Sequence, residues 1–570
     1  MMSEKLRNLL IYGVLILLPS LVFAYSCGFD FLSSWDDDMF ITRNSAGLVL
    51  SFSNIHYWLT HKCIDNYLPL TMFSYMFDFN LWGLQPLPYH IQNLFWHICA
   101  VLAVYRILLF FGISKGTSFF LAAVFAVHPQ RVESVVWLSE RKDVICGALY
   151  LWSVYFYLKK LSSDKIPLLS LFLFVGALMA KPMAISLPAI LLCCEFYRKR
   201  DFDIKAYFLK LWPFFTLALA FVPITVSTRE YYTDGLSIAS RILTVLHNIP
   251  WYLWKTFLPE NLSPVYPKVF YSDMLLLKLF LSYTLCFSIF FLLFRKDKRG
   301  FYYAALPLLF SYFTVLAPVI GFLPLGGIDY TDRYSYLPSV IILLALGLCM
   351  KRILPEKKHI AVVPAAFIVI VFLSLTTFYY ALSWKNMYSI CSAASIHEPP
   401  NPLPLVTLGY FELENKNYRR VFEISEKLKS LKGDKPSVFF NTNLSGYLTG
   451  TALYRMGETG TALKIFENIK GFMKNNTYTT NADYCMMLLC MAGEYLKKGE
   501  NLKAASCYDE ITLSPGNDEF RNLYFTGMSE YLRGNRSSAL KTFGKLKELH
   551  PQDREIGKIY EQIKRSIEEK

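Results

Sequence analysis

The sequence predicts an all-α protein with a polytopic membrane domain followed by a soluble domain of helical repeats. Of its 570 residues, 54% are hydrophobic and only 18% are charged, and a soluble chain of this size would carry more surface charge. A series of long apolar runs before residue 385 is the second observation. The third is a drop in hydrophobicity near residue 400, after which apolar and small residues recur at helical spacing.

About eleven apolar runs approach the length needed to cross the hydrocarbon of a bilayer as helices. Small residues ending at Ala24 could mark a cleaved signal peptide, but the many later spans favour an uncleaved first helix. We therefore place a membrane domain at 1–385 and a second domain at 386–570. The runs lie near 9–29, 93–112, 117–128, 143–158, 166–180, 183–197, 207–228, 274–294, 302–323, 337–350 and 360–382.

Basic residues cluster in the short gaps between these runs. With a cytoplasmic N-terminus, every cluster lies on the cytoplasmic side, where Lys and Arg are enriched in membrane proteins. The net charge of +14 is thus explained by orientation and does not indicate nucleic-acid binding. The long first loop 30–92, the loop 229–273 and the repeats are then expected outside the cytoplasm. The clusters are Lys5 and Arg7; Lys115; Lys159, Lys160 and Lys165; Arg198, Lys199, Arg200 and Lys205; Arg295, Lys296, Lys298 and Arg299; and Lys351, Arg352, Lys357 and Lys358.

Polar motifs on the outer side carry the candidate site residues. They are HPQRVESVVWLSERKD at 128–143, MAKP at 179–182, NLSPVYP at 261–267 and DYTDRYSYLP at 329–338, together with three aspartates after the first span. Charged side chains so close to apolar spans are expected to line one cavity, although ion pairs formed only for packing are an alternative. The candidates are Asp36, Asp37, Asp38, His128, Glu133, Arg141, Lys142, Asp143, Lys181, Asp332 and Arg333.

Two site types are not indicated. Twelve cysteines are scattered along the chain, and neither a CxxC pair nor a His-rich spacing predicts a disulfide framework or a zinc site. A cavity with acids and bases side by side suits a substrate that carries a phosphate and a sugar.

The segment after 400 fits the tetratricopeptide pattern, in which small residues allow close packing of paired helices. A plain helical cap on the membrane domain is the alternative. The clearest unit has Gly527, Gly534, Ala539, Phe543 and Pro551; a second has Ala492, Tyr495, Gly499, Ala504, Tyr508 and Pro515; a third has Gly450, Gly457, Ala462 and Phe466; and a degenerate fourth has Leu408, Gly409 and Val421. Such a solenoid would offer a groove for a protein segment.

In order and spacing, these motifs resemble the transmembrane and tetratricopeptide-repeat-containing O-mannosyltransferases and their bacterial relatives, which are GT-C type glycosyltransferases. The resemblance is carried by WDDDMFITRN at 35–44, NYLPLTMFSYMFDFNLWGLQPLPYH at 66–90, HPQRVESVVWLSERKDV, KPMAISLPAILL, LPENLSPVYP and DRYSYLP. It implies transfer of a sugar, with mannose one candidate, from a polyprenyl-phosphate donor to a protein or glycan on the outer face. It also implies a catalytic pair at Asp36 and Asp37. Leu68 stands where a basic or imidazole side chain is expected.

The chemistry of such a transfer assigns roles to the candidates. Asp36 or Asp37 would accept the proton of the acceptor hydroxyl, and a divalent cation such as Mg²⁺ or Mn²⁺ held by both is chemically reasonable, although the sequence does not show one. Four cations would bind the donor phosphate as charge develops on it, and five further residues would support the site. The four are Arg141, Lys142, Lys181 and Arg333; the five are Asp38, His128, Glu133, Asp143 and Asp332.

Two other functions stay open. A ligase or polymerase of surface polysaccharide also uses lipid-linked sugars, and a non-catalytic scaffold could present the repeats to partners. The expected partners are the lipid-linked donor, membrane lipids and an acceptor that reaches the site through the repeat groove. The expected location is a bacterial inner membrane, or the endoplasmic reticulum membrane in a eukaryote.

Overall fold

The computed structural model describes most of the chain, and every regular element in the described part is a helix, with one isolated bridge between Cys63 and Asn66. The prediction of an all-α protein is therefore confirmed. The described residues are 3–33, 35–64, 66–161, 166–199, 203–228, 237–267, 269, 273–294, 301–321, 329–353, 359–397, 400–431, 435–475, 481–514 and 518–569. Of the basic residues predicted to mark the cytoplasmic side, Lys165, Arg200, Arg295, Lys296, Lys298, Arg299, Lys357 and Lys358 lie outside these ranges.

The chain divides into two compact units, Met1–Asn401 and Pro402–Lys570. Ile390 of α18 (Met387–Ala394) belongs to the main hydrophobic core of the first unit. Trp384, at the end of α17 (His359–Leu382), lies in the same core. The division into domains at 385/386 stays a prediction.

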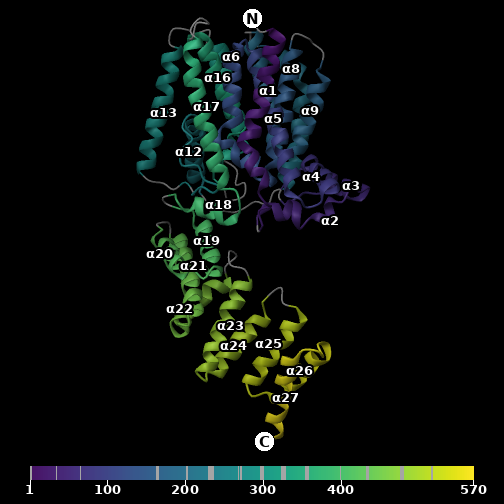
Figure 1. The fold of residues 1–570 in the computed structure, drawn as a ribbon, viewed down its shortest axis with the longest axis vertical. Coiled ribbons are helices and arrows are strands. Elements are labelled where there is room, and N and C mark those ends of the chain that lie inside the picture. The colour runs from purple at the N-terminus through teal and green to yellow at the C-terminus, as the bar shows by residue number, and fades with distance from the viewer. Residues whose placement is uncertain are drawn as a thin grey trace. The chain divides into compact units, whose positions relative to one another are not determined.

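Long helices of the first unit run side by side, with the N-terminus at one end and the short helices α2, α3 and α18 at the other (Figure 1). The long helices are α1 (Glu4–Phe23), α5 (Pro86–Phe110), α6 (Lys115–Val127), α8 (Arg141–Lys159), α9 (Leu168–Ala180), α10 (Leu187–Lys199), α11 (Ile204–Thr228), α12 (Ile238–Phe257), α13 (Asp273–Phe294), α15 (Leu306–Leu316) and α16 (Pro338–Ile353). The shorter ones are η1 (Ala24–Gly28), η2 (Asp38–Thr42), α2 (Ser45–Leu48), α3 (Phe52–Thr60), α4 (Pro69–Trp82), η3 (Pro129–Arg131), α7 (Val132–Val136), η4 (Leu138–Glu140), η5 (Pro182–Ser186), η6 (Phe301–Ala305) and η7 (Asp332–Ser335).

Four helical stretches in the described part are long and apolar enough to span a membrane: Glu4–Gly28, Pro86–Phe110, Lys205–Thr228 and Val363–Leu382. Four shorter apolar helices accompany them, at Lys115–Val127, Leu168–Ala180, Met274–Cys286 and Tyr303–Leu316. Length and composition therefore support several spans, but they do not establish the predicted number of about eleven.

Helix α8 packs against both α5 and α9. Nearly all of its residues are buried. Gly147 permits this close packing, because a Cβ at that position would lie 2.4 Å from the ring of Tyr336. The beginning of α8, which carries the charges of Arg141, Lys142 and Asp143, is thereby held against the segment just before α16.

Three prolines fix where the site residues lie. Pro129, Pro182 and Pro338 each stand at the first position of a helix, where the missing N–H costs nothing. The ring also disfavours a helical conformation for the preceding residue. Lys181 is accordingly extended, with φ −156° and ψ 134°, and its side chain leaves the end of α9 beside the start of α8.

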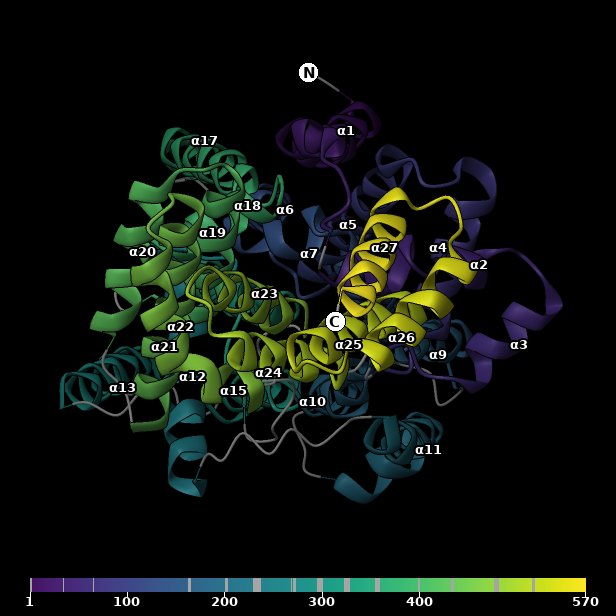
Figure 2. The same ribbon diagram turned by 90° about the horizontal axis from the view of Figure 1, so that it is seen from below.

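In the second unit, helices follow one another in pairs from α19 to α27 (Figure 2). Neighbours in sequence pack together, and small residues lie where helices touch: a Cβ on Gly527 would approach the Phe543 ring to 2.7 Å. Gly534, in the turn before α26, has φ +83°, a value that favours glycine. The helices are α19 (Pro402–Glu414), α20 (Tyr418–Ser430), α21 (Lys435–Arg455), α22 (Thr459–Asn475), α23 (Asn481–Lys497), α24 (Asn501–Thr512), α25 (Glu519–Leu532), α26 (Arg536–Leu549) and α27 (Arg554–Glu568).

This arrangement is consistent with the predicted repeats. Lys416 has φ +58° between α19 and α20, at the turn of the degenerate repeat that contains Gly409 and Val421. Pro515, predicted to close one repeat, lies outside the described residues.

Candidate active site

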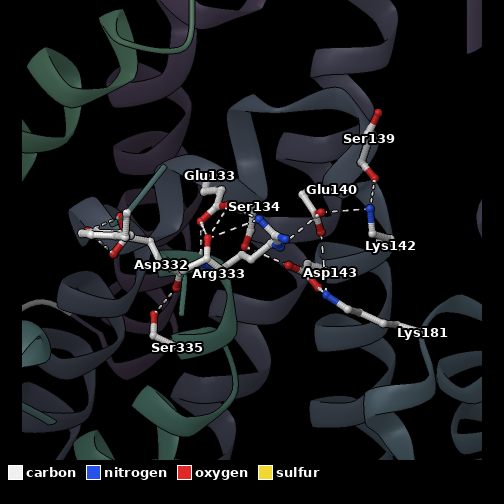
Figure 3. Close-up of polar contacts among 12 residues, drawn as sticks. Glu133, Ser134, Ser139, Glu140, Lys142, Asp143, Lys181, Asp332, Arg333 and Ser335 are labelled. Atoms are coloured by element: carbon white, nitrogen blue, oxygen red, sulfur yellow. Dashed lines mark hydrogen bonds and ion pairs between the residues drawn. The ribbon is translucent and has the colours of Figure 1, made fainter. Parts of the chain in front are cut away.

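Three cations surround one buried carboxylate, that of Glu140 in η4 (Figure 3). Lys142 Nζ lies 2.9 Å from Glu140 Oε1, and Arg333 Nε lies 3.3 Å from the same oxygen. Lys181 Nζ lies 3.7 Å from the other oxygen, Oε2. These cations come from α8, from the segment between α9 and η5, and from η7, so the structure brings together three of the four predicted phosphate-binding residues.

Two more predicted acids complete this ion-pair network. Glu133 accepts hydrogen bonds from the Thr331 hydroxyl at 2.6 Å and from the Arg333 backbone N–H at 2.8 Å, and it pairs with the Arg333 guanidinium. Asp143 pairs with Lys181 and lies 3.3 Å from the donor hydroxyl of Ser134. Each cation is thus held by at least one carboxylate.

The network favours the charged forms of Glu140 and Lys181. Burial by itself would raise the pKa of Glu140, but the charges of Lys142, Arg333 and Lys181 lower it. Burial opposes the charge of Lys181, yet its pKa lies above the ordinary value because Asp143 and Glu140 stabilise the ammonium. Glu140 and Lys181 are therefore ionised at neutral pH.

The two aspartates predicted to be catalytic differ in their surroundings. Asp37 is fully buried and accepts hydrogen bonds from the backbone N–H groups of Leu32 and Ser139, each at 2.9 Å, and from the Ser139 hydroxyl. Burial raises its pKa to about 6, although these hydrogen bonds act in the opposite direction. Both of its oxygens are therefore engaged in holding the loop.

Asp36 is half-buried and accepts no hydrogen bond from a described residue. Burial raises its pKa, while the charges of Lys142 and Arg333 lower it. Asp36 thus lies within electrostatic range of the cation cluster, and no described residue donates a hydrogen bond to its carboxylate. Asp38 is turned away into its own helical segment, where it accepts from Thr42 at 2.7 Å and pairs with the exposed Arg43 at 3.1 Å.

Arg141 lies apart from the three cations. It is fully buried and pairs with Asp78 at 2.5 Å. It also donates to Asn93 at 2.8 Å and to the Tyr89 carbonyl at 2.9 Å. Its guanidinium stacks on Tyr75 at 4.6 Å. These contacts join α8 to α4 and α5 and leave Arg141 no access to the Glu140 cluster.

His128 and Asp332 contact neighbouring segments instead of Glu140. His128 is buried, with Nε2 3.1 Å from the Thr256 carbonyl. Asp332 accepts hydrogen bonds from the hydroxyls of Tyr266 at 3.1 Å and Tyr380 at 2.9 Å. Burial raises the pKa of Asp332 to about 7. Both residues position the loops around the site.

The long loop that follows the first predicted span, 30–92, contacts three consecutive residues, 137–139, immediately before Glu140. Trp35 packs edge-to-face on Trp137, with ring centroids 5.4 Å apart. The Tyr75 hydroxyl donates to the Leu138 carbonyl at 2.8 Å. Asp37 accepts from Ser139, as described above. We call 137–139 the docking segment.

The structure does not favour a metal ion between Asp36 and Asp37. Within the described ranges, no group of three or more His, Cys, Asp or Glu side chains is placed to hold a metal. The oxygens of Asp37 already accept three hydrogen bonds from the protein, so Asp37 would have to give these up to become a ligand.

Sequence reasoning did not single out three residues that matter here: Glu140, Ser139 and Asp78. Glu140 begins the run ERKD, and this density of charge could have drawn attention to it. Ser139 and Asp78 carry no such signal, because their partners Asp37 and Arg141 lie 102 and 63 residues away.

Comparison with known proteins gives distant relatives of one kind, while no protein-family model matches the chain. A Caenorhabditis elegans protein O-mannosyl-transferase is 24% identical over 450 residues, covering 71% of this chain and 60% of that protein. The Mus musculus protein O-mannosyl-transferase TMTC3 is 28% identical over 184 residues, 30% of this chain and 19% of its own. A Drosophila melanogaster protein O-mannosyl-transferase is 30% identical over 127 residues, 22% of this chain and 15% of its own.

The chain therefore spans less than two thirds of the length of each of these relatives. The similarity is low in identity but extends over most of this chain in the first case. It confirms the resemblance predicted from the motifs: the chain is a distant relative of proteins named protein O-mannosyl-transferase.

Proposed function

We propose that the chain is an integral membrane glycosyltransferase that moves a sugar, with mannose one candidate, from a polyprenyl-phosphate donor to a hydroxyl of a protein or glycan acceptor. Transfer takes place on the extracytoplasmic face, in a membrane domain of about eleven spans with a cytoplasmic N-terminus. The observation that carries this proposal is the group of three cations around Glu140, with the carboxylate of Asp36 within electrostatic range of it.

The cations retain hydrogen-bond donors for a phosphate. No described residue accepts a hydrogen bond from Arg333 Nη2, and the Arg333 side chain is 11% exposed. The Lys142 ammonium uses two of its three N–H groups, toward the Ser139 carbonyl and Glu140. These donors are held in place before substrate binds, as stabilisation of a developing charge requires. Arg141 is not included, because its guanidinium is enclosed by Asp78 and its neighbours.

Asp36 acts as the general base in this proposal. The acceptor hydroxyl loses its proton to the Asp36 carboxylate while its oxygen attacks the anomeric carbon. The bond from that carbon to the donor phosphate breaks, and the phosphate leaves with the electron pair. Lys142, Lys181 and Arg333 stabilise the charge on its oxygens. Asp37 holds the loop that carries Asp36.

A protein acceptor would approach through the repeats, whose paired helices form the kind of surface that binds polypeptide segments. The helix pairs of the second unit support this part of the proposal. Neither the acceptor nor the sugar is defined by any contact in the site.

The test is transfer of labelled sugar by the purified full-length chain, with a panel of polyprenyl-phosphate sugars and a mixture of acceptor proteins. The wild type is expected to add single sugars. Asp36→Asn should lower the rate by roughly 10²–10⁴-fold while protein yield stays the same. Asp38→Asn is the matched control and should keep most of the activity.

Two results would overturn the proposal. Full activity of Asp36→Asn would remove the base from the mechanism. Addition of whole glycan chains would instead favour a polysaccharide ligase or polymerase, and a chain that transfers no sugar from any donor in the panel would favour a scaffold.

A further inference from the structure

Ser139 is the residue at which the loop 30–92 meets the cation cluster. Its backbone N–H and its hydroxyl both donate to Asp37 Oδ1. Its carbonyl accepts from Lys142 Nζ at 2.9 Å. Ser139 is fully buried, so water does not compete for these hydrogen bonds. One residue thus uses all of its polar groups to connect two parts of the site.

The two parts have different chemical tasks if the proposed function holds. Asp37 is the neighbour of the proposed base, and Lys142 is one of the proposed phosphate ligands. Because Asp37 also accepts from the Leu32 N–H at 2.9 Å, its carboxylate ties the beginning of the loop to the docking segment. Any shift of that carboxylate displaces Asp36, which is covalently next to it.

We infer that Ser139 is a positioning residue for sugar transfer: its hydroxyl holds Asp36 at a fixed place relative to the phosphate-binding cations. This inference rests on the proposed function and adds a residue to it. Ser139 touches neither substrate. Its hydroxyl positions Asp36 by holding the neighbouring Asp37. Its carbonyl positions Lys142 by accepting a hydrogen bond from Nζ.

The roles of the Ser139 hydroxyl and the Ser139 carbonyl can be tested separately. Ser139→Ala removes the hydroxyl donor and keeps both the N–H toward Asp37 and the carbonyl toward Lys142. The loop should therefore loosen while the phosphate site stays intact. A misplacement of about 1 Å in a reacting group can slow a reaction by roughly 10²-fold, so we expect the transfer step to slow by about 10- to 100-fold.

The experiment uses the purified full-length chain and the donor that the wild type accepts. The number of donor molecules bound per chain gives the fraction of correctly folded sites, and the Kd gives the affinity for the donor. The rate of single-turnover transfer measures the chemical step. Ser139→Ala should bind donor with unchanged stoichiometry and within twofold of the wild-type Kd, yet transfer slowly. Ser153→Ala is the matched control: Ser153 is also a buried serine of this domain, but its hydroxyl donates to the Ser170 carbonyl at 2.7 Å, away from the site.

A double-mutant comparison shows whether the effect passes through Asp37. Asp37→Ala leaves the Ser139 hydroxyl without its acceptor. In a chain that already carries Asp37→Ala, Ser139→Ala should slow transfer by less than a further twofold. Wild-type transfer by Ser139→Ala, lost donor stoichiometry in that variant, or independent slowing in the Asp37→Ala chain would each overturn the inference. A wild type without transfer activity contradicts the proposed function instead, so the two failures are distinguishable.

Discussion

Arg141 and Lys142 are neighbours in sequence but have different surroundings. Successive residues of a helix point about 100° apart, so the first turn of α8 sends Arg141 toward α4 and α5 and Lys142 toward Glu140. Arg141 is completely buried against Asp78, whereas Lys142 remains part of the proposed phosphate site. Adjacent charges in one motif therefore serve different purposes.

Arg141→Ala should destabilise the membrane domain by about 3–5 kcal/mol, because it leaves the buried Asp78 carboxylate without its partner. The apparent melting temperature and the yield of the full-length chain in detergent measure this loss. Arg43→Ala is the matched control, since Arg43 pairs with Asp38 at the surface, where ion pairs contribute little. A stable Arg141→Ala chain with weakened donor binding would instead restore Arg141 to the phosphate site.

The helices of the second unit depend on small residues at their crossings. Gly527 and Gly557 both lie within helices, but only Gly527 faces a neighbour: a Cβ there would meet Phe543 at 2.7 Å, whereas nothing lies within 4 Å of one on Gly557. Phe543 is fully buried and cannot move aside without repacking. Substitution of Gly557 is therefore a suitable control for substitution of Gly527.

Gly527→Ala should destabilise the unit by about 1–3 kcal/mol through overpacking. Gly557→Ala should stabilise it by about 0.5–1 kcal/mol, because alanine has the higher helix propensity. Thermal unfolding of a 402–570 fragment, followed by circular dichroism, measures both, since this unit has hydrophobic cores of its own. Changes of the same sign in the two variants would contradict the packing described here.

Sequence patterns predicted the helical class and the repeats because both depend on short-range periodicity. They also predicted Lys142, Lys181 and Arg333 as one group, since membrane orientation places their motifs on one side. They could not separate Asp36 from Asp37, because that difference arises from Ser139, far away in sequence. The span count is uncertain for a local reason: α15 has 11 residues and α10 has 13, fewer than the roughly 20 of a typical span.

The proposed orientation makes a testable statement about the complete chain. If basic clusters mark the cytoplasmic side, the loop after α8 lies in the cytoplasm, and both the Glu140 cluster and the second unit lie outside. Reporter fusions after Lys160 should therefore give a cytoplasmic signal, and fusions after Asn401 an external one. An external reading at Lys160 or a cytoplasmic one at Asn401 would place the site on the wrong side for an outer-face transferase.

The contacts of the Glu140 cluster also determine when it can form during biosynthesis. Glu133 binds the Arg333 backbone, 200 residues later, and Asp37 binds Ser139, 102 residues later. Contacts between such distant residues require closure of long loops and form late in folding. A nascent chain that has not yet reached residue 333 holds Glu133 and Glu140 without their arginine. A partly synthesised chain therefore lacks the complete cluster on which the proposed transfer depends.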